Sequence, residues 1–262
     1  MNLGLYVTRR RDDGYHDIET IFYPLRVNDV LEIVPAARPK LHTSGLAVAG
    51  NETDNLVWKA YQILSADHPG KVPPLDMYLH KIIPMGAGLG GGSADGAHML
   101  RLLNEYCHLG LSAAQLAAYA LQLGSDCPFF IYNTPQFASG RGEVMQDIAL
   151  DLSEYSIQLI CPKVHVATGK AFSMITPKPA GFDLRNIGSL PLTEWKHNIS
   201  NDFEGPVFAQ HPALAAIKQQ LYDQGALYAA MSGSGSAIFG IFPKNRKAAV
   251  NTDTLFENFY IA

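Results

Sequence analysis

The chain has 262 residues, of which 47% are hydrophobic, so it can bury a sizeable core in one large domain or two modest ones. Its net charge of −4 argues against a nucleic-acid-binding protein, and no apolar run is long enough to cross a membrane. The three cysteines are too few and too widely spaced for a disulfide framework or a metal cluster, and the first residues do not resemble a signal peptide. We therefore expect a cytoplasmic globular protein without nucleic-acid or membrane partners.

The first third of the chain is predicted to form strands separated by polar turns, because its apolar residues alternate or run together. The expected strands are residues 2–7 (NLGLYV), 17–25 (DIETIFYPL), 29–35 (DVLEIVP) and 76–83 (DMYLHKII). Between the last two of these, residues 54–66 carry apolar side chains at helical spacing. Asp54 is expected to cap the start of that helix.

A glycine-rich segment, residues 84–92, follows the fourth strand and leads into a helix predicted over residues 93–107. A second helix is expected over residues 112–124, because a serine can cap its start and a glycine its end. Residues 125–133 (SDCPFFIYN) are predicted to turn into a short apolar strand.

The pattern changes beyond residue 153, and residues 185–202 are predicted to be mostly irregular. The elements expected in this half are a strand over 155–164, a short helix over 168–175, a helix over 212–225 and two strands within 226–242 around a Gly/Ser turn. No internal repeat is present in the sequence. We therefore predict an α+β chain with an N-terminal half, residues 1–153, and a C-terminal half, residues 154–262.

The glycine-rich stretch PMGAGLGGGS, residues 84–93, is unusual because a helix start rarely needs so much bare backbone. A strand, a glycine loop and a helix N-terminus together form an anion site, since free N–H groups converge there and the helix dipole adds positive charge. The second cluster, SGSGSA at residues 232–237, is by itself typical of a hairpin turn. The two clusters together suggest backbone nests that close on one polyphosphate. The plainer alternative is a tight turn that happens to be rich in glycine.

Three familiar phosphate-binding loops do not fit this stretch. A P-loop needs Lys and then Ser or Thr after its last glycine, whereas Gly92 is followed by Ser93 and Ala94. A dinucleotide fingerprint needs an acid at the end of a second strand, and Glu105, at about the right spacing, falls inside the predicted helix. The H-R-D and D-F-G triplets of protein kinases are absent from the sequence.

The motifs resemble those of the superfamily of galactokinase, homoserine kinase, mevalonate kinase and phosphomevalonate kinase. PMGAGLGGGSADGA at residues 84–97 resembles the superfamily's glycine signature, and SGSGSA resembles its third motif. The opening at residues 2–22, together with LGSDCPFF at 123–130 and SNDFE at 200–204, resembles one branch. That branch phosphorylates a cytidylyl diphosphate sugar alcohol in non-mevalonate isoprenoid precursor synthesis. The resemblance covers nearly the whole chain.

The resemblance implies an α+β, two-domain small-molecule kinase fold with its active site in the inter-domain cleft. It makes residues 1–153 an N-terminal ATP-binding domain and residues 154–262 a C-terminal kinase domain. The implied reaction is transfer of the γ-phosphoryl group of ATP, with Mg²⁺, to an alcohol of a small-molecule substrate. The alternatives are a homoserine or mevalonate kinase and a catalytically weakened nucleotide-binding paralogue, and the oligomeric state stays open.

The nucleotide is expected on the two glycine clusters. The residues predicted to bind it are Pro84, Gly86, Gly88, Leu89, Gly90, Gly91, Gly92, Ser93, Gly233, Ser234 and Gly235. Ser93 is expected to offer its hydroxyl to the β-phosphate or to Mg²⁺, or to cap the helix. The resemblance places Asn55 and Lys81 near the adenine and ribose, although chemistry alone would make Lys81 an ordinary solvated lysine.

The resemblance also implies one catalytic residue and several substrate contacts. Asp126 in LGSDCPFF is expected to act as the general base, while an isolated aspartate at a turn is more often a cap. Tyr15 is expected to stack on a pyrimidine ring and His16 to bond its edge, against the alternative of a surface turn. The remaining substrate contacts expected are Phe22 and Phe172, which would complete an aromatic clamp, and Asn2 and Thr168, which would bind the diphosphate or the polyol.

The start of the chain departs from the superfamily pattern. The first motif there reads Pro-Ala-Lys-[IL]-Asn-Leu, and Met1 occupies the position of its Ile or Leu. We expect the missing lysine, which pairs with the catalytic aspartate, to be encoded just upstream of Met1. The chain as given is expected to bind ATP but to turn over slowly.

Overall fold

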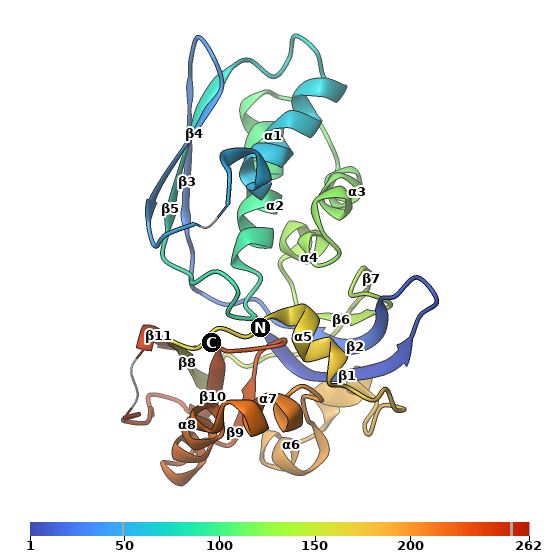
Figure 1. Ribbon diagram of the computed structural model, residues 1–262, viewed down its shortest axis with the longest axis vertical. Coiled ribbons are helices and arrows are strands. Elements are labelled where there is room, and N and C mark those ends of the chain that lie inside the picture. The colour runs from blue at the N-terminus through green and yellow to red at the C-terminus, as the bar shows by residue number, and fades with distance from the viewer. Residues whose placement is uncertain (49, 252–253, 262) are drawn as a thin grey trace. The chain divides into compact units, whose positions relative to one another are not determined.

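The computed structural model describes residues 1–48, 50–251 and 254–261. Contacts between residues divide the chain into two compact units. Figure 1 shows the chain coloured by residue number. The first unit comprises Met1–Arg26, Gly86–Leu89 and Thr134–Ala262, and the second comprises Val27–Met85 and Gly90–Asn133. This grouping differs from a single cut after residue 153, because residues 1–26 and 134–153 group with the C-terminal residues; the N–H of Leu5, for example, donates to the carbonyl of Ser200 at 2.9 Å.

The first unit contains a four-stranded antiparallel sheet that includes the start of the chain. Its order is β1 (Asn2–Arg10), β2 (His16–Phe22), β6 (Gln136–Ser139) and β7 (Val144–Asp147). The register pairs Asn2 with Phe22 at one end of β1 and Arg10 with His16 at the other. The sequence predicted β1 and β2 but missed β6 and β7, which have four residues each and are too short to show a period.

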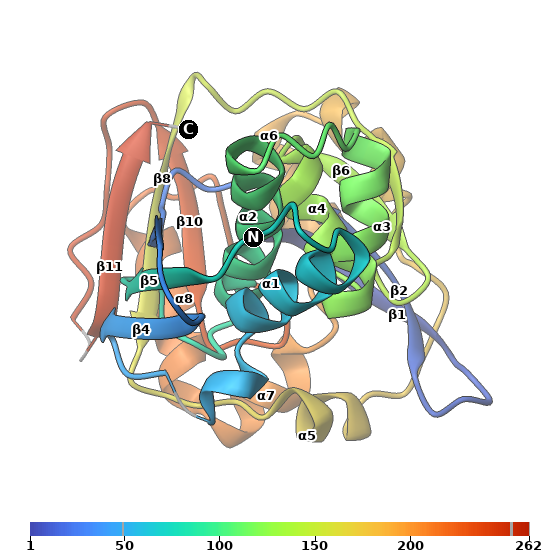
Figure 2. The ribbon, with the colours of Figure 1, turned by 90° about the horizontal axis from the view of Figure 1, so that it is seen from above.

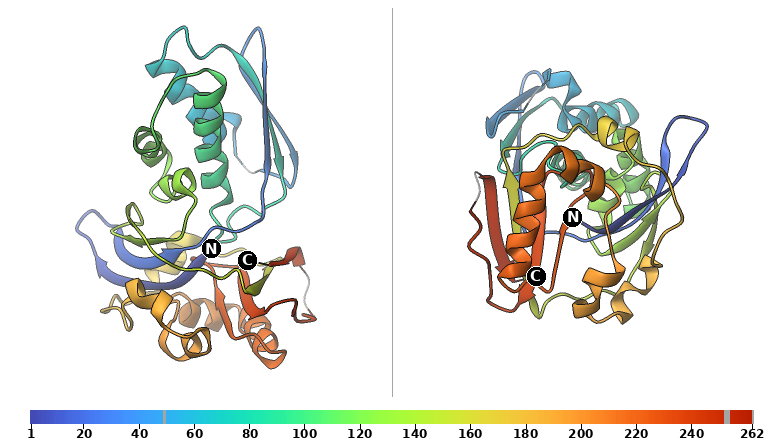
Figure 3. Two further views of the ribbon diagram at one scale, coloured as in Figure 1. Left: turned by 180° about the vertical axis from the view of Figure 1, so that it is seen from behind. Right: turned by 60° about the horizontal axis from the view of Figure 1, so that its bottom comes forward.

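A second four-stranded sheet completes the first unit. Its order is β11 (Thr254–Ile261), β8 (Tyr155–Pro162), β10 (Ile238–Pro243) and β9 (Tyr228–Met231). The helix α8 (Pro212–Asp223) packs on this sheet, as the right-hand view of Figure 3 shows. Its apolar positions Leu214, Ile217 and Leu221 are buried among strand residues such as Ile238 and Ile160. The helix itself was predicted over residues 212–225, and its apolar positions lie three and four residues apart, as on one face of a helix.

The segment before α8 is not mostly irregular, so that prediction was wrong. It contains short helices: η2 (Leu184–Ser189), α6 (Leu192–Asn198) and α7 (Glu204–Gln210), with α5 (Thr168–Ser173) earlier in the chain as expected. Each has six or seven residues, and α6 buries Leu192 and Trp195 against the rest of the unit. Tertiary packing therefore stabilises helices that are too short to form alone.

The second unit is a three-stranded sheet covered on one face by helices (Figures 1 and 2). The strands are β3 (Val30–Pro35), β5 (Leu75–Lys81) and β4 (Lys40–Gly45), with β5 in the middle. The helices are η1 (Glu52–Asp54), α1 (Leu56–Asp67), α2 (Gly91–Tyr106), α3 (Ala113–Leu123) and α4 (Cys127–Tyr132). Leu75, Met77 and Leu79 project from one face of β5 into the core that these helices close.

Two local predictions in the second unit were wrong. The cap of α1 is Asn55, whose Oδ1 accepts the N–H of Val57 at 2.9 Å, rather than Asp54. Residues 127–132 form the helix α4 rather than a strand, since Pro128 fits the first turn of a helix and Cys127 and Ile131 pack into the helical core. No helix in the described part of the chain is both long and apolar enough to span a membrane.

Candidate active site

The first half of the glycine segment, residues 86–89, is bonded to the Gly/Ser hairpin in the first unit. Ser232 Oγ donates to the carbonyl of Gly88 at 2.8 Å, and the N–H of Ala237 donates to the carbonyl of Ala87 at 2.9 Å. Gly88 has φ +76°, and a Cβ there would collide with the carbonyl oxygen of Ser232. A side chain is therefore excluded twice at Gly88, by conformation and by space.

Several polar residues hold the hairpin of residues 232–235 in place. Asn201 is buried, and its Nδ2 donates to the carbonyls of Met231 and Gly233, both at 2.8 Å. The backbone N–H of Asn2 donates to Ser232 Oγ at 3.1 Å, and the hydroxyls of Thr168 and Ser234 lie 3.0 Å apart. The structure thus brings Asn2, Thr168 and the hairpin together.

No role was predicted for Ser232 or Asn201 from the sequence. Both occur in stretches that carry the resemblance, SGSGSA and SNDFE. The Asn2 side chain is itself engaged, because its Nδ2 donates to the buried hydroxyl of Thr20 at 3.0 Å. Phe22, the last residue of β2, is half-buried and lies opposite Asn2 in the register.

The second half of the glycine segment opens α2 in the second unit. Gly90, with φ +68°, precedes the helix, and Gly91, Gly92 and Ser93 form its first turn. The first N–H groups of a helix have no acceptor within the helix, and the helix dipole favours negative charge there. This turn is a suitable site for a phosphate. Among the other predicted contacts, Pro84 and Leu89 are buried.

Asp126 lies beside this helix start. It directly precedes α4, and the hydroxyl of Ser93 donates to its Oδ1 at 3.0 Å. A Cβ placed on Gly90 would lie 3.5 Å from its Oδ2. Burial raises the pKa of Asp126 above its ordinary value. The hydrogen bond from Ser93 lowers this pKa, but by less than burial raises it. A carboxylate with a raised pKa is a better proton acceptor, so the arrangement suits general-base chemistry.

Lys81 is not the solvated lysine that its chemistry alone suggests, since only 1% of it is exposed. Its ammonium contacts the carboxylate of Asp29 and, at 2.7 Å, that of Asp95 in the first turns of α2. Asp29 Oδ1 also accepts the N–H groups of Ile82 at 2.5 Å and Ile83 at 2.9 Å. Burial raises the pKa of Asp95 to about 6, which Lys81 opposes. No role was predicted for either aspartate from the sequence.

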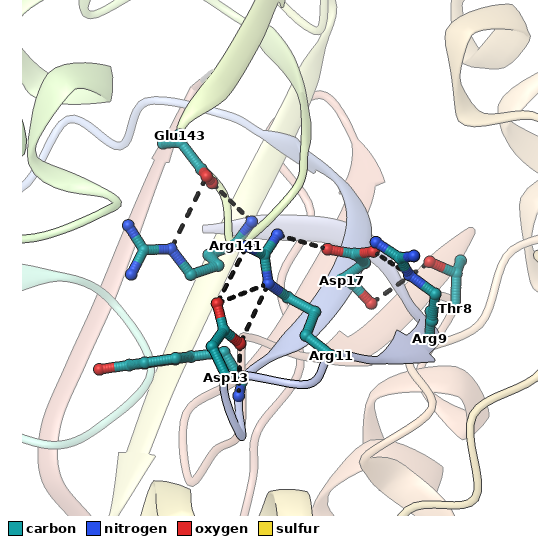
Figure 4. Close-up of polar contacts among 8 residues, drawn as sticks. Thr8, Arg9, Arg11, Asp13, Asp17, Arg141 and Glu143 are labelled. Carbon is teal, nitrogen blue, oxygen red and sulfur yellow. Dashed lines mark hydrogen bonds and ion pairs between the residues drawn. The ribbon is translucent and has the colours of Figure 1, made fainter.

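The predicted substrate residues on the β1–β2 hairpin lie in the first unit. Tyr15 is 58% exposed in the turn, where its N–H donates to Asp13 Oδ1 at 3.1 Å. His16 stacks on Phe172 of α5, with ring centroids 5.0 Å apart and planes inclined by 20°. Figure 4 shows the charged residues that surround the turn. The roles proposed for these side chains stay predictions.

Two segments of the chain match descriptions of one family. Residues 55–134 match the GHMP kinases N terminal domain, and residues 188–253 match GHMP kinases C terminal. The chain therefore belongs to the GHMP kinase family, a class of ATP-dependent phosphotransferases. The α+β, two-domain kinase fold expected from the sequence is confirmed.

Two relatives and one solved structure carry the name of one enzyme. A 4-diphosphocytidyl-2-C-methyl-D-erythritol kinase of Parabacteroides distasonis is 50% identical over 93% of this chain and 89% of the relative. The enzyme of that name from Bacteroides fragilis is 49% identical over 94% and 91%. A crystal structure of 4-(cytidine 5'-diphospho)-2C-methyl-D-erythritol kinase has a TM-score of 0.72 and 32% identity, covering 92% of this chain and 86% of that one. Homoserine kinase from Cytophaga hutchinsonii shares the fold, with a TM-score of 0.65 at 16% identity over 93% and 84%.

Proposed function

We propose that the chain transfers the γ-phosphoryl group of ATP to the 2-hydroxyl of 4-diphosphocytidyl-2-C-methyl-D-erythritol. The observation that carries this proposal is the 50% identity, over 93% of the chain, to a relative named for that substrate. The reaction is a step of non-mevalonate isoprenoid precursor synthesis and would take place in the cytoplasm. In chain order, residues 1–153 would form the N-terminal ATP-binding half and residues 154–262 the C-terminal half.

In this proposal the phosphates of ATP bind to the first turn of α2, and the nucleotide contacts expected for Gly233, Ser234 and Gly235 stay predictions. The N–H groups of Gly91, Gly92 and Ser93 supply donors without carrying a full charge. The chemistry of phosphoryl transfer then rests on positioning and on stabilising the charge of the transferred group. Asn55 and Lys81 would lie near the adenine and ribose, with the Lys81 ammonium engaged by Asp29 and Asp95 rather than by the ligand.

Mg²⁺ fits the donors beside α2, because it prefers oxygen ligands and binds through one or two carboxylates together with substrate phosphates. Ser93 Oγ, in the first turn of α2, is such an oxygen, and the phosphates of the nucleotide would supply others. When bound there, the ion would neutralise charge on the phosphates. Ser93 would hold it.

Asp126 would act as the general base. Ser93 occupies its Oδ1, so Oδ2 is the oxygen that would accept the hydrogen bond and then the proton of the attacking hydroxyl. Tyr15 would stack on the cytosine and His16 would hydrogen-bond its edge, with Phe22 and Phe172 as further ring contacts. Stacking of one base contributes about 1–3 kcal/mol. Asn2 and Thr168 would contact the diphosphate or the polyol.

An ADP-release assay over a panel of alcohols tests the proposal. We expect turnover with 4-diphosphocytidyl-2-C-methyl-D-erythritol and none with homoserine or mevalonate. Turnover with either of those two alcohols and none with the cytidylyl substrate would replace the proposal with another small-alcohol kinase. Binding of ATP without turnover on any alcohol would identify a nucleotide-binding paralogue instead.

A further inference from the structure

The turn that carries Tyr15 is closed by two backbone hydrogen bonds. The N–H of Arg11 donates to the carbonyl of Tyr15 at 2.9 Å, and the N–H of Gly14 donates to the carbonyl of Arg11 at 3.2 Å. The carboxylate of Asp13 accepts hydrogen bonds from the N–H of Tyr15 and from Nε of Arg11 (Figure 4). The Nη1 of Arg11 pairs with the carboxylate of Asp17 at 3.0 Å. The hydrogen bond from Arg11 holds the pKa of Asp13 below its ordinary value, so this carboxylate stays charged.

The Tyr15 ring extends from this turn, and Arg141 lies over one of its faces. The guanidinium carbon is 5.1 Å from the ring centroid, within the range of a cation–π contact. Arg141 comes from a different hairpin, the turn between β6 and β7. Its backbone N–H donates to Glu143 Oε2 at 2.5 Å, and its Nε lies 3.7 Å from Glu143 Oε1 (Figure 4). Arg141 therefore connects two turns through the tyrosine ring.

A guanidinium on one face fixes the orientation of an aromatic side chain and leaves the other face for a ligand. Tyr15 remains 58% exposed with Arg141 in place, so its ring stays accessible. An unrestrained surface side chain loses rotamer freedom when a base stacks on it, and this loss weakens binding. A ring that is already held in place loses less.

We propose that Arg141 is a positioning residue for the substrate, which orients Tyr15 for stacking on the pyrimidine ring of a cytidylyl ligand. This inference rests on the proposed function, because that function supplies the pyrimidine. Arg141 acts through Tyr15 and does not contact the phosphates. It therefore contributes to the affinity for cytidine and for CDP equally, and not to the affinity for ATP.

Calorimetry with cytidine, CDP and ATP as ligands tests the proposal. Arg141→Ala should raise the Kd of cytidine and of CDP by the same factor, about two- to fivefold for an exposed cation–π contact. Arg141→Lys should recover part of the loss. In a Tyr15→Leu background, Arg141→Ala should have no further effect on either ligand. The KM of the cytidylyl substrate should rise in proportion, while kcat and the KM of ATP stay unchanged.

Arg185→Ala is the matched control, because the Arg185 guanidinium lies over the ring of Phe137 at 5.6 Å in the same unit. It should leave all three affinities unchanged. A loss seen with CDP but not cytidine, and retained in the Tyr15→Leu background, would show a direct phosphate contact and overturn the positioning role. Unchanged affinities in Arg141→Ala would overturn it as well. A wild-type chain that binds ATP but neither cytidine nor CDP would overturn the proposed function together with this inference.

Discussion

Replacing Lys81 by methionine tests the buried charge cluster beneath the start of α2. The exposed fractions of the side chains are 0% for Lys81, 4% for Asp29 and 6% for Asp95. Methionine fills a similar volume but removes the ammonium, which leaves two carboxylates out of contact with both water and a cation. Removing one partner of a buried ion pair typically destabilises a protein by about 3–5 kcal/mol. With two carboxylates left unpaired, we expect the upper end of this range at pH 8.

The loss of stability in Lys81→Met should depend on pH. The folded-state pKa of Asp95 is already about 6, above its unfolded value, and Lys81 lowers it. Without Lys81 this pKa rises further, so the variant loses more stability than the wild type as the pH increases from about 6 to 8. Below that window, a proton on the carboxyl pair relieves the repulsion, and the loss should approach the lower end of the range.

Urea unfolding followed by far-UV circular dichroism at pH 5.5 and pH 8 measures both effects. Lys244→Met is the matched control, because the Lys244–Glu154 pair is exposed, and such pairs contribute about 0–1 kcal/mol. The double variant Lys81→Met/Asp95→Asn should recover part of the loss, since it removes one of the two stranded charges. If Lys81→Met were no more destabilising than Lys244→Met at pH 8, the buried cluster would not stabilise the fold.

Three further predictions concern the proposed reaction. Asp126→Asn should lower kcat by about 10²–10⁴-fold with little change in the Kd of ATP, and near-normal turnover would leave Asp126 merely structural. In the wild type, the raised pKa of Asp126 means that kcat should fall with decreasing pH earlier than for an ordinary carboxylate, as a pH–rate profile would show. Gly88→Ala should raise the KM of ATP and lower the Tm, because its Cβ meets the carbonyl of Ser232, whereas Gly110→Ala, with a similar φ but open space, should change only stability.

The sequence predicted the features that have a local signal. Amphipathic helices such as α8 show their period within a dozen residues, and the glycine segment lies directly between β5 and α2. The short elements β6, β7, η2 and α6 gave no such signal, and α4 was predicted as a strand because CPFFIY is apolar throughout. For these elements packing decides the structure. The partners that hold the predicted site residues were also missed, since Asn201 reaches the hairpin from some 30 residues away.

The burial of Lys81 could have been predicted from its own strand. Successive side chains of a strand alternate between its two faces. In LDMYLHK, residues 75–81, the apolar residues Leu75, Met77 and Leu79 therefore share one face. Lys81 is the next member of that series, so the same alternation places it on the buried face. A lysine there needs carboxylates, because an unpaired buried charge is strongly unfavourable. The alternation therefore predicts that acidic partners exist, although only the fold reveals that they are Asp29 and Asp95.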